Sequence, residues 1–149
     1  MTQPLSDVDG PLAFLVDVDG TVALRGDRNP YDESRVSEDT PNQPVIAVVQ
    51  ALILYGLIPL YISGRTSACA QATSAWLIRQ IGAPLDGTLR LFMRDTGDSR
   101  PDAVIKSELY DKKIAPYYCV VLSLDDRDRV VEMWRAKGLT CLQVAEGNF

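Results

Sequence analysis

A chain of 149 residues, 46% of them hydrophobic and 23% charged, is long enough for one globular domain with a true core and too short for two. Its formal net charge of −5 argues against nonspecific binding to a long nucleic-acid duplex, because that affinity comes from many Lys and Arg side chains. The absence of histidine excludes Ser-His-Asp and Cys-His catalysis. Eleven of the fifteen basic residues are arginine, so a local patch of them remains able to hold phosphate groups.

Residues 1–11 lack hydrophobic periodicity and are expected to form a loose N-terminal tail before a single domain over 12–149. The first element is predicted at F-L-V-D-V-D-G-T, residues 14–21, whose apolar side chains are typical of a strand buried on both faces. Asp17 and Asp19 lie at its carboxyl end, the edge where open α/β sheets bind ligands. Because side chains two apart on a strand point the same way, we expect both carboxylates to face one crevice, with a cation or a proton between them.

Residues 24–44 form a polar, turn-rich segment that exceeds the usual length of a connection, and we expect a functional flap there. After it, apolar helical patterns alternate with short strand patterns. The predicted helices cover 44–55, 69–81, 102–114 and 128–137, and the predicted strands cover 57–62, 89–93, 118–124 and 140–144. This alternation predicts an α/β fold with a doubly wound parallel sheet of Rossmann type and right-handed crossovers.

Four groups of polar residues fall at or near the carboxyl edge of the predicted sheet. They are Asp17 with Asp19, Ser63, Lys106, and Asp125 with Asp126. Four carboxylates in one crevice would repel one another strongly. A bound Mg²⁺ would relieve this repulsion and keep coordination positions free for water and a substrate phosphate. The sequence therefore predicts a magnesium site that handles phosphate.

These residues resemble the four motifs of the haloacid dehalogenase superfamily of phosphotransferases, which read here as D-V-D-G-T, the Ser of I-S-G-R, Lys106 and L-D-D. The resemblance implies the fold of that superfamily with no large cap domain. It implies that Asp17 is the nucleophile that forms an aspartyl phosphate and that Asp19 is the general acid and then the general base. Ser63 and Lys106 would bind the phosphoryl oxygens.

The same resemblance implies how Mg²⁺ would be held. Its ligands would be Asp17, the backbone carbonyl of Asp19 and a carboxylate of the Asp125–Asp126 pair, with the other carboxylate of that pair supporting the ligand. From the residues alone an alternative stays open, in which Asp126 supports Arg127 rather than the metal.

From Phe14 to the C-terminus the chain resembles the 3′-phosphatase domain of bacteriophage polynucleotide kinase-phosphatase. The shared motifs are R-x-P-Y-D, S-G-R, G-D-x-R with D-x-x-x-K, and D-D-R-x-x-V-V-E-M-W-R with Q-V-A-x-G-x-F. The resemblance implies substrate contacts for a further set of residues. This set is Arg28, Arg65, Arg94, Thr21 and Gly64, with Asp102 orienting one of the arginines.

The implied activity is that of a magnesium-dependent polynucleotide 3′-phosphatase acting on the 3′-phosphate ends of DNA or RNA. No G-x-x-x-x-G-K-[ST] loop is present, so the chain is not expected to phosphorylate 5′ ends. A separate kinase or ligase is a candidate partner. The sequence makes no prediction of the number of subunits.

Three alternatives remain. The first is a phosphatase of the same superfamily that acts on free nucleotides. A chain without a large cap leaves its site open, which favours the end of a polynucleotide over a small substrate that needs enclosure. The second is a phosphoaspartate switch resembling a receiver domain. In that family the phosphorylated Asp lies on a middle strand and the acidic pair follows the first strand, whereas here the candidate nucleophile Asp17 lies on the first predicted strand. The third is a catalytically inert subunit, which would conflict with the intact motifs.

Individual residues also have structural interpretations. Lys106 could be a solvated partner of Asp102, and Trp76 and Trp134 are expected to be core residues.

The three cysteines have no C-x-x-C spacing, which argues against a disulfide framework and against zinc. No apolar run reaches membrane-spanning length, and the first residues lack the pattern of a signal peptide. We therefore expect reduced thiols, no membrane association and a cytoplasmic location, which would be the host cytoplasm if the chain is encoded by a phage.

Overall fold

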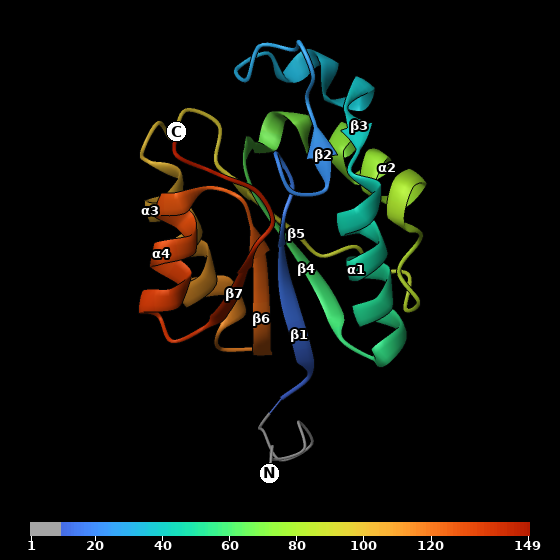
Figure 1. Ribbon diagram of the computed structural model, residues 1–149, viewed down its shortest axis with the longest axis vertical. Coiled ribbons are helices and arrows are strands. Elements are labelled where there is room, and N and C mark those ends of the chain that lie inside the picture. The colour runs from blue at the N-terminus through green and yellow to red at the C-terminus, as the bar shows by residue number, and fades with distance from the viewer. Residues whose placement is uncertain (1–9) are drawn as a thin grey trace.

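The strand β1 (Leu12–Asp17) lies at the centre of a parallel sheet, as expected from its uninterrupted apolar residues. The computed structural model describes residues 10–149, so most of the predicted N-terminal tail, residues 1–9, lies outside the described residues. The five strands follow the order β5-β4-β1-β6-β7 (Figure 1). The remaining four are β4 (Ile58–Thr66), β5 (Leu91–Arg94), β6 (Cys119–Asp125) and β7 (Thr140–Gln143).

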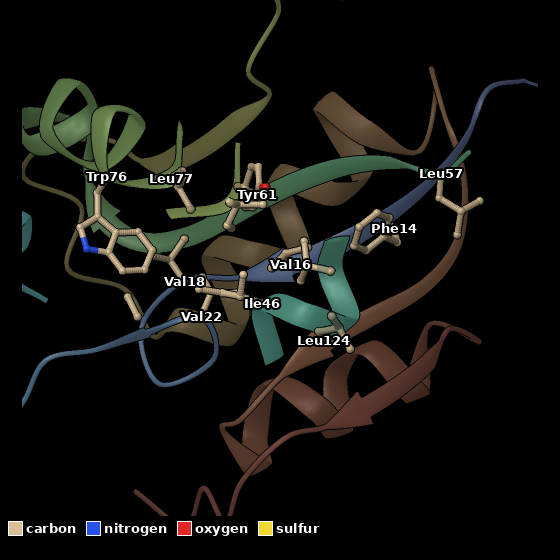
Figure 2. Close-up of a cluster of buried hydrophobic side chains, with 13 residues drawn as sticks. Phe14, Val16, Val18, Val22, Ile46, Leu57, Tyr61, Trp76, Leu77 and Leu124 are labelled. Atoms are coloured by element: carbon tan, nitrogen blue, oxygen red, sulfur yellow. The ribbon is translucent and has the colours of Figure 1, made fainter. Parts of the chain in front are cut away.

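Over residues 10–149, four α-helices cover the two faces of this sheet, which confirms the doubly wound α/β fold (Figure 1). They are α1 (Gln43–Tyr55), α2 (Ala70–Ile81), α3 (Asp102–Leu109) and α4 (Asp128–Ala136). Alternate side chains of β1 enter two separate cores. Phe14 and Val16 pack on the side of α1 and α2 (Figure 2), whereas Ala13 and Leu15 pack on the side of α4. The predicted core positions Trp76 and Trp134 are almost completely buried.

Most predicted ends lie within a residue of the observed ones, but two elements end well away from their predicted ends. The helix predicted over 102–114 is α-helical only to Leu109 and continues as a π-helical turn over Tyr110–Ile114. Ala115 still has helical backbone angles, and Pro116 after it has no backbone N–H with which to continue the helix. The strand predicted over 57–62 extends to Thr66, because its pairing with β5 resumes after an irregularity between Ser63 and Thr66.

The predicted flap contains two short antiparallel strands, β2 (Ala23–Leu24) and β3 (Thr40–Pro41), with 3-10 helical turns over Glu33–Glu38 between them. The indole N–H of Trp76 donates to the backbone carbonyl of Asp39 at 2.8 Å. The Glu33 carboxylate accepts from the backbone N–H of Thr66 at 2.7 Å. The flap therefore docks on α2 and on the end of β4, beyond the carboxyl ends of the strands (Figure 1).

Among the described residues, no helix has both the length and the apolar character that crossing a bilayer requires.

Candidate active site

Three aspartates from two adjacent strands meet at the carboxyl edge of the sheet. Asp17 is the last residue of β1, Asp125 is the last residue of β6, and Asp126 follows it. Because β1 and β6 pair in parallel, their ends come side by side. One carboxylate oxygen of each aspartate lies within 4.8 Å of the other two, and all three residues are buried. The chain-distant acidic groups thus converge as the sequence predicts.

Lys106 projects from α3 into this cluster. Its Nζ donates to Asp17 Oδ1 at 2.6 Å and to Asp125 Oδ2 at 2.9 Å, while Asp102 Oδ2 is farther away at 3.6 Å. The side chain is 1% exposed, so the interpretation as a solvated partner of Asp102 is wrong. Burial alone would lower the pKa of Lys106, but the carboxylates of Asp125 and Asp17 outweigh it and hold the pKa well above its ordinary value.

One ammonium group does not balance three carboxylates. Burial, followed by the charge of Asp125, raises the pKa of Asp17 well above its ordinary value, and the same two causes raise the pKa of Asp126. Burial and the neighbouring charge of Asp125 thus make the ionised form of these two carboxylates costly, so they take up a proton more readily than exposed carboxylates do. A divalent cation would relieve the same repulsion, and carboxylate oxygens are the donors that Mg²⁺ prefers. The donor set therefore fits a magnesium ion.

The turn after β1 presses against this cluster. The Thr21 hydroxyl donates to Asp17 Oδ2 at 2.8 Å, which fixes the orientation of that carboxylate. Gly20 has a φ of +82°, and a Cβ at this position would collide with the Asp126 carboxylate. Glycine is therefore required here both by the backbone conformation and by the close approach of the acid.

The Asp19 side chain does not join the three buried aspartates, contrary to the expectation that it would share one crevice with Asp17. The reason is that β1 ends at Asp17, so the period of two no longer applies. Asp19 instead accepts from Arg65 Nε at 3.0 Å and from Arg65 Nη2 at 2.7 Å. Its side chain is 41% exposed, which leaves it open to solvent and to a substrate.

Asp39 is a buried site residue that the sequence analysis missed. It accepts two hydrogen bonds from Arg28, at 2.8 and 3.0 Å, and one from Arg65 at 2.6 Å. Arg28 also lies 3.5 Å from Asp19. We call Arg28, Asp39, Arg65 and Asp19 the arginine–aspartate cluster. Two buried arginines require a buried acid, but the sequence indicated neither the burial of Arg28 and Arg65 nor which acid of the flap accompanies them.

The arginine–aspartate cluster changes the interpretation of two predicted substrate contacts. Arg28 and Arg65 are 5% and 4% exposed, and carboxylates bind both guanidinium groups in this structure. Arg65 also donates to the Thr73 hydroxyl at 3.0 Å. Substrate phosphate would therefore have to compete with Asp19, the one exposed acid of the cluster, for these N–H groups.

The remaining predicted residues surround the start of α3. The Ser63 hydroxyl is buried and accepts from the backbone N–H of Arg65 at 3.1 Å, so its hydrogen remains able to donate to a phosphoryl oxygen. A Cβ at Gly64 would collide with the Asp102 carboxylate. Arg94 donates to the Gly64 carbonyl at 2.9 Å and lies 3.5 Å from Asp102 Oδ1. Among the described residues this buried Oδ1 atom has no hydrogen-bond partner.

Neutralising Asp39 should destabilise the fold. Asp39→Asn removes one of two negative charges that compensate two buried guanidinium groups, and breaking a buried ion pair in this way costs about 3 kcal/mol or more. We expect a corresponding loss in the free energy of unfolding measured by urea denaturation. Glu38→Gln, a neutralisation of an exposed acid in the same flap, is the matched control and should change that free energy by less than about 0.5 kcal/mol. Equal stability of Asp39→Asn and the unmodified chain would contradict the role of Asp39.

The chain is similar in sequence to known proteins. A family model described as the polynucleotide kinase PNKP phosphatase domain matches residues 11–149. Over 127 residues the chain is 36% identical to a putative bifunctional polynucleotide kinase/RNA ligase of Autographa californica nuclear polyhedrosis virus, a match that covers 84% of this chain and 18% of that protein.

Solved structures of other proteins also resemble this chain. A chain of the Pnkp1/Rnl/Hen1 RNA repair complex superposes with a TM-score of 0.87 at 38% identity and covers 100% of this chain and 46% of that one. The Class C acid phosphatase from Bacillus anthracis superposes with a TM-score of 0.67 at 17% identity and covers 97% of this chain and 70% of that one; this likeness shows the fold alone. The chain spans less than half the length of its relatives in the virus and in the RNA repair complex.

Proposed function

Because this chain belongs to the polynucleotide kinase PNKP phosphatase domain family, we propose that it is a magnesium-dependent 3′-phosphatase that acts on polynucleotide ends through a phosphorylated aspartate. The chain is a phosphomonoesterase with the haloacid dehalogenase fold. The observation that carries the proposal is the buried cluster of Asp17, Asp125 and Asp126 with Lys106 at the carboxyl edge of the sheet.

Asp17 supplies the nucleophile. Its carboxylate is oriented by Thr21 and kept close to the positive charge of Lys106. A bond forms between a carboxylate oxygen and phosphorus while the bond from phosphorus to the 3′ oxygen breaks, and the electron pair goes to the 3′ oxygen. Water then attacks the phosphorus of the aspartyl phosphate, which releases inorganic phosphate and restores Asp17. Lys106 and the Ser63 hydroxyl bind the phosphoryl oxygens in both steps.

Asp19 supplies the proton transfers. It lies two residues after the nucleophile and is exposed, so it is positioned to give a proton to the leaving 3′ oxygen and later to take one from the attacking water. Its present partner, Arg65, has N–H groups that also suit phosphate. We infer that the terminal phosphate takes over these N–H groups and thereby releases Asp19 for catalysis, with Arg28 and Arg94 completing the binding of the strand end.

Asp126, rather than Asp125, is the proposed direct magnesium ligand of the pair. The Asp125 carboxylate already accepts from the backbone N–H groups of Asp126 and Arg127, from Lys106 and from the Trp134 indole. The other direct ligands would be Asp17 and the backbone carbonyl of Asp19. When bound, Mg²⁺ neutralises charge on the carboxylates and on the phosphoryl group. The alternative in which Asp126 only supports Arg127 is disfavoured by its place in the buried cluster.

Removal of metal should abolish most activity. Chelation with EDTA is expected to slow phosphate release by at least about 100-fold, because a metal ion supplies several kcal/mol of charge stabilisation, and added Mg²⁺ should restore it. Mg²⁺ should also raise the melting temperature of the unmodified chain, since it binds the folded state, but not that of Asp126→Asn. Glu132→Gln, which neutralises an exposed acid on α4, should keep the shift. Full activity in EDTA would contradict the proposal.

The substrate is proposed to be a 3′-phosphorylated RNA end. This rests on relatives that include a putative polynucleotide kinase/RNA ligase and a chain of an RNA repair complex, which also support a kinase or ligase as the partner. The test is a panel of 3′-phosphate, 2′-phosphate, cyclic-phosphate and 3′-hydroxyl oligonucleotides with and without Mg²⁺. We expect phosphate release from the 3′-phosphate oligonucleotides. Faster release from nucleoside monophosphates would favour a nucleotide phosphatase, and a long-lived phosphoenzyme without turnover would favour a switch.

A further inference from the structure

The last residues of the chain are tied to the loop that carries the acidic cluster. The Val144 N–H donates to the Asp125 carbonyl at 3.1 Å, and the Asp128 N–H donates to the Gly147 carbonyl at 3.0 Å. A Cβ at Gly147 would collide with the backbone of Asp126, so the two segments are in close contact. The C-terminus consequently lies at the same end of the sheet as the flap (Figure 1).

This arrangement places an exposed aromatic ring beside the candidate active site. Phe149 is 67% exposed as a residue, and the Arg127 guanidinium carbon lies 4.8 Å from the centroid of its ring. Arg127 Nη1 lies 3.9 Å from Asp102 Oδ2, and that oxygen lies 3.6 Å from Lys106 Nζ. Three successive contacts therefore connect the ring to the ammonium group that is proposed to hold the phosphoryl oxygens.

The chemistry of this pair suits a nucleobase. An aromatic ring offers a stacking surface to any base, and the adjacent guanidinium group attracts the phosphates of the strand that carries it. Phe149 has no role in the catalytic steps proposed above, and leaving a large apolar ring exposed at this place gives the fold no core packing in return.

We propose that Phe149, with Arg127 against its ring, is a stacking site for a base within the last two nucleotides of the 3′-phosphorylated strand. The proposal rests on the proposed function, because it assigns part of the substrate of that same site. It predicts that the enzyme recognises the base near the phosphate as well as the phosphate itself, with tolerance for which base is present.

The first test compares Phe149→Leu with Phe149→Trp in steady-state hydrolysis of 3′-phosphorylated oligonucleotides. Loss of one stacked base should raise KM by about 10-fold for Phe149→Leu with little change in kcat, and Phe149→Trp should restore KM. The matched control is Tyr117→Leu, which removes an equally exposed aromatic ring, at 67%, from the loop before β6 at the opposite end of the sheet. It should leave KM unchanged.

The second test removes the base instead of the ring. An oligonucleotide that is abasic at one of its last two nucleotides should show the same rise in KM with the unmodified enzyme, and Phe149→Leu should then add nothing further. An equal effect of Phe149→Leu on the abasic and the intact oligonucleotides, or no effect on either, would overturn the stacking site. Absence of hydrolysis of every 3′-phosphorylated oligonucleotide by the unmodified enzyme would instead overturn the proposed function, and the stacking site with it.

Discussion

Asp17→Asn is expected to reduce phosphate release by about 10⁴-fold or more, because an amide cannot act as the attacking nucleophile. The fold should be kept. Asn has nearly the same shape as Asp, and removing one of three buried carboxylates relieves the burial of a charge and the repulsion from Asp125, the two causes that raise the pKa of Asp17. We therefore expect the free energy of unfolding measured by urea denaturation to stay at least as high as that of the unmodified chain in the absence of metal.

A second variant that also neutralises an aspartate tests whether phosphate release is lost because the nucleophile is missing or because the net charge has changed. Asp27→Asn changes an exposed aspartate on the flap, and its rate should stay close to that of the unmodified chain. Substantial phosphate release by Asp17→Asn would remove the covalent mechanism, since no other carboxylate in the buried cluster is proposed to attack phosphorus.

Lys106→Met is the second large effect that we expect. Lys106 is the only cation within hydrogen-bonding distance of both Asp17 and Asp125 among the described residues. Methionine fills similar space without the charge, so the phosphoryl oxygens lose a positive partner and kcat should fall by about 100-fold to 1,000-fold. The buried carboxylates lose compensation as well, which should lower the free energy of unfolding by about 3 kcal/mol.

Added Mg²⁺ should separate the effect of Lys106→Met on stability from its effect on kcat. A divalent cation replaces the missing charge on the carboxylates, so Mg²⁺ should stabilise Lys106→Met more than it stabilises the unmodified chain, whereas kcat should stay low. Lys112→Met, at an exposed position in the π-helical turn after α3, is the control and should change neither quantity appreciably. A Lys106→Met variant with unaltered kcat would contradict the assigned role.

The positions that the sequence predicts correctly are those that topology determines. Asp17 and Asp125 each end a buried parallel strand, and strands of one sheet that run in the same direction bring their carboxyl ends to one edge. The buried partnership of Lys106 with both acids, 89 and 19 positions away, does not follow from strand ends and was implied by the resemblance to known motifs.

What the sequence does not reveal depends on turns and irregular segments. The direction of the Asp19 side chain does not follow from the alternation of β1, because that strand ends at Asp17 and Asp19 accepts hydrogen bonds from Arg65 instead. Asp39 lies in the flap, where no hydrophobic period indicates which residues are buried, and its partner Arg65 is 26 positions away. The extension of β4 to Thr66 depends on an irregular pairing with β5, which has no signature in the residues of β4 alone.

The central claim is that Asp17 accepts the terminal 3′-phosphate of a polynucleotide. The direct measurement uses an oligonucleotide with a radioactive 3′-phosphate, mixed with the enzyme and Mg²⁺, quenched in acid within one turnover and followed by digestion and identification of the labelled peptide. The account predicts label on the peptide that contains Asp17, lost as inorganic phosphate appears, and none in Asp17→Asn. Release of labelled phosphate without label on that peptide at any time would contradict it.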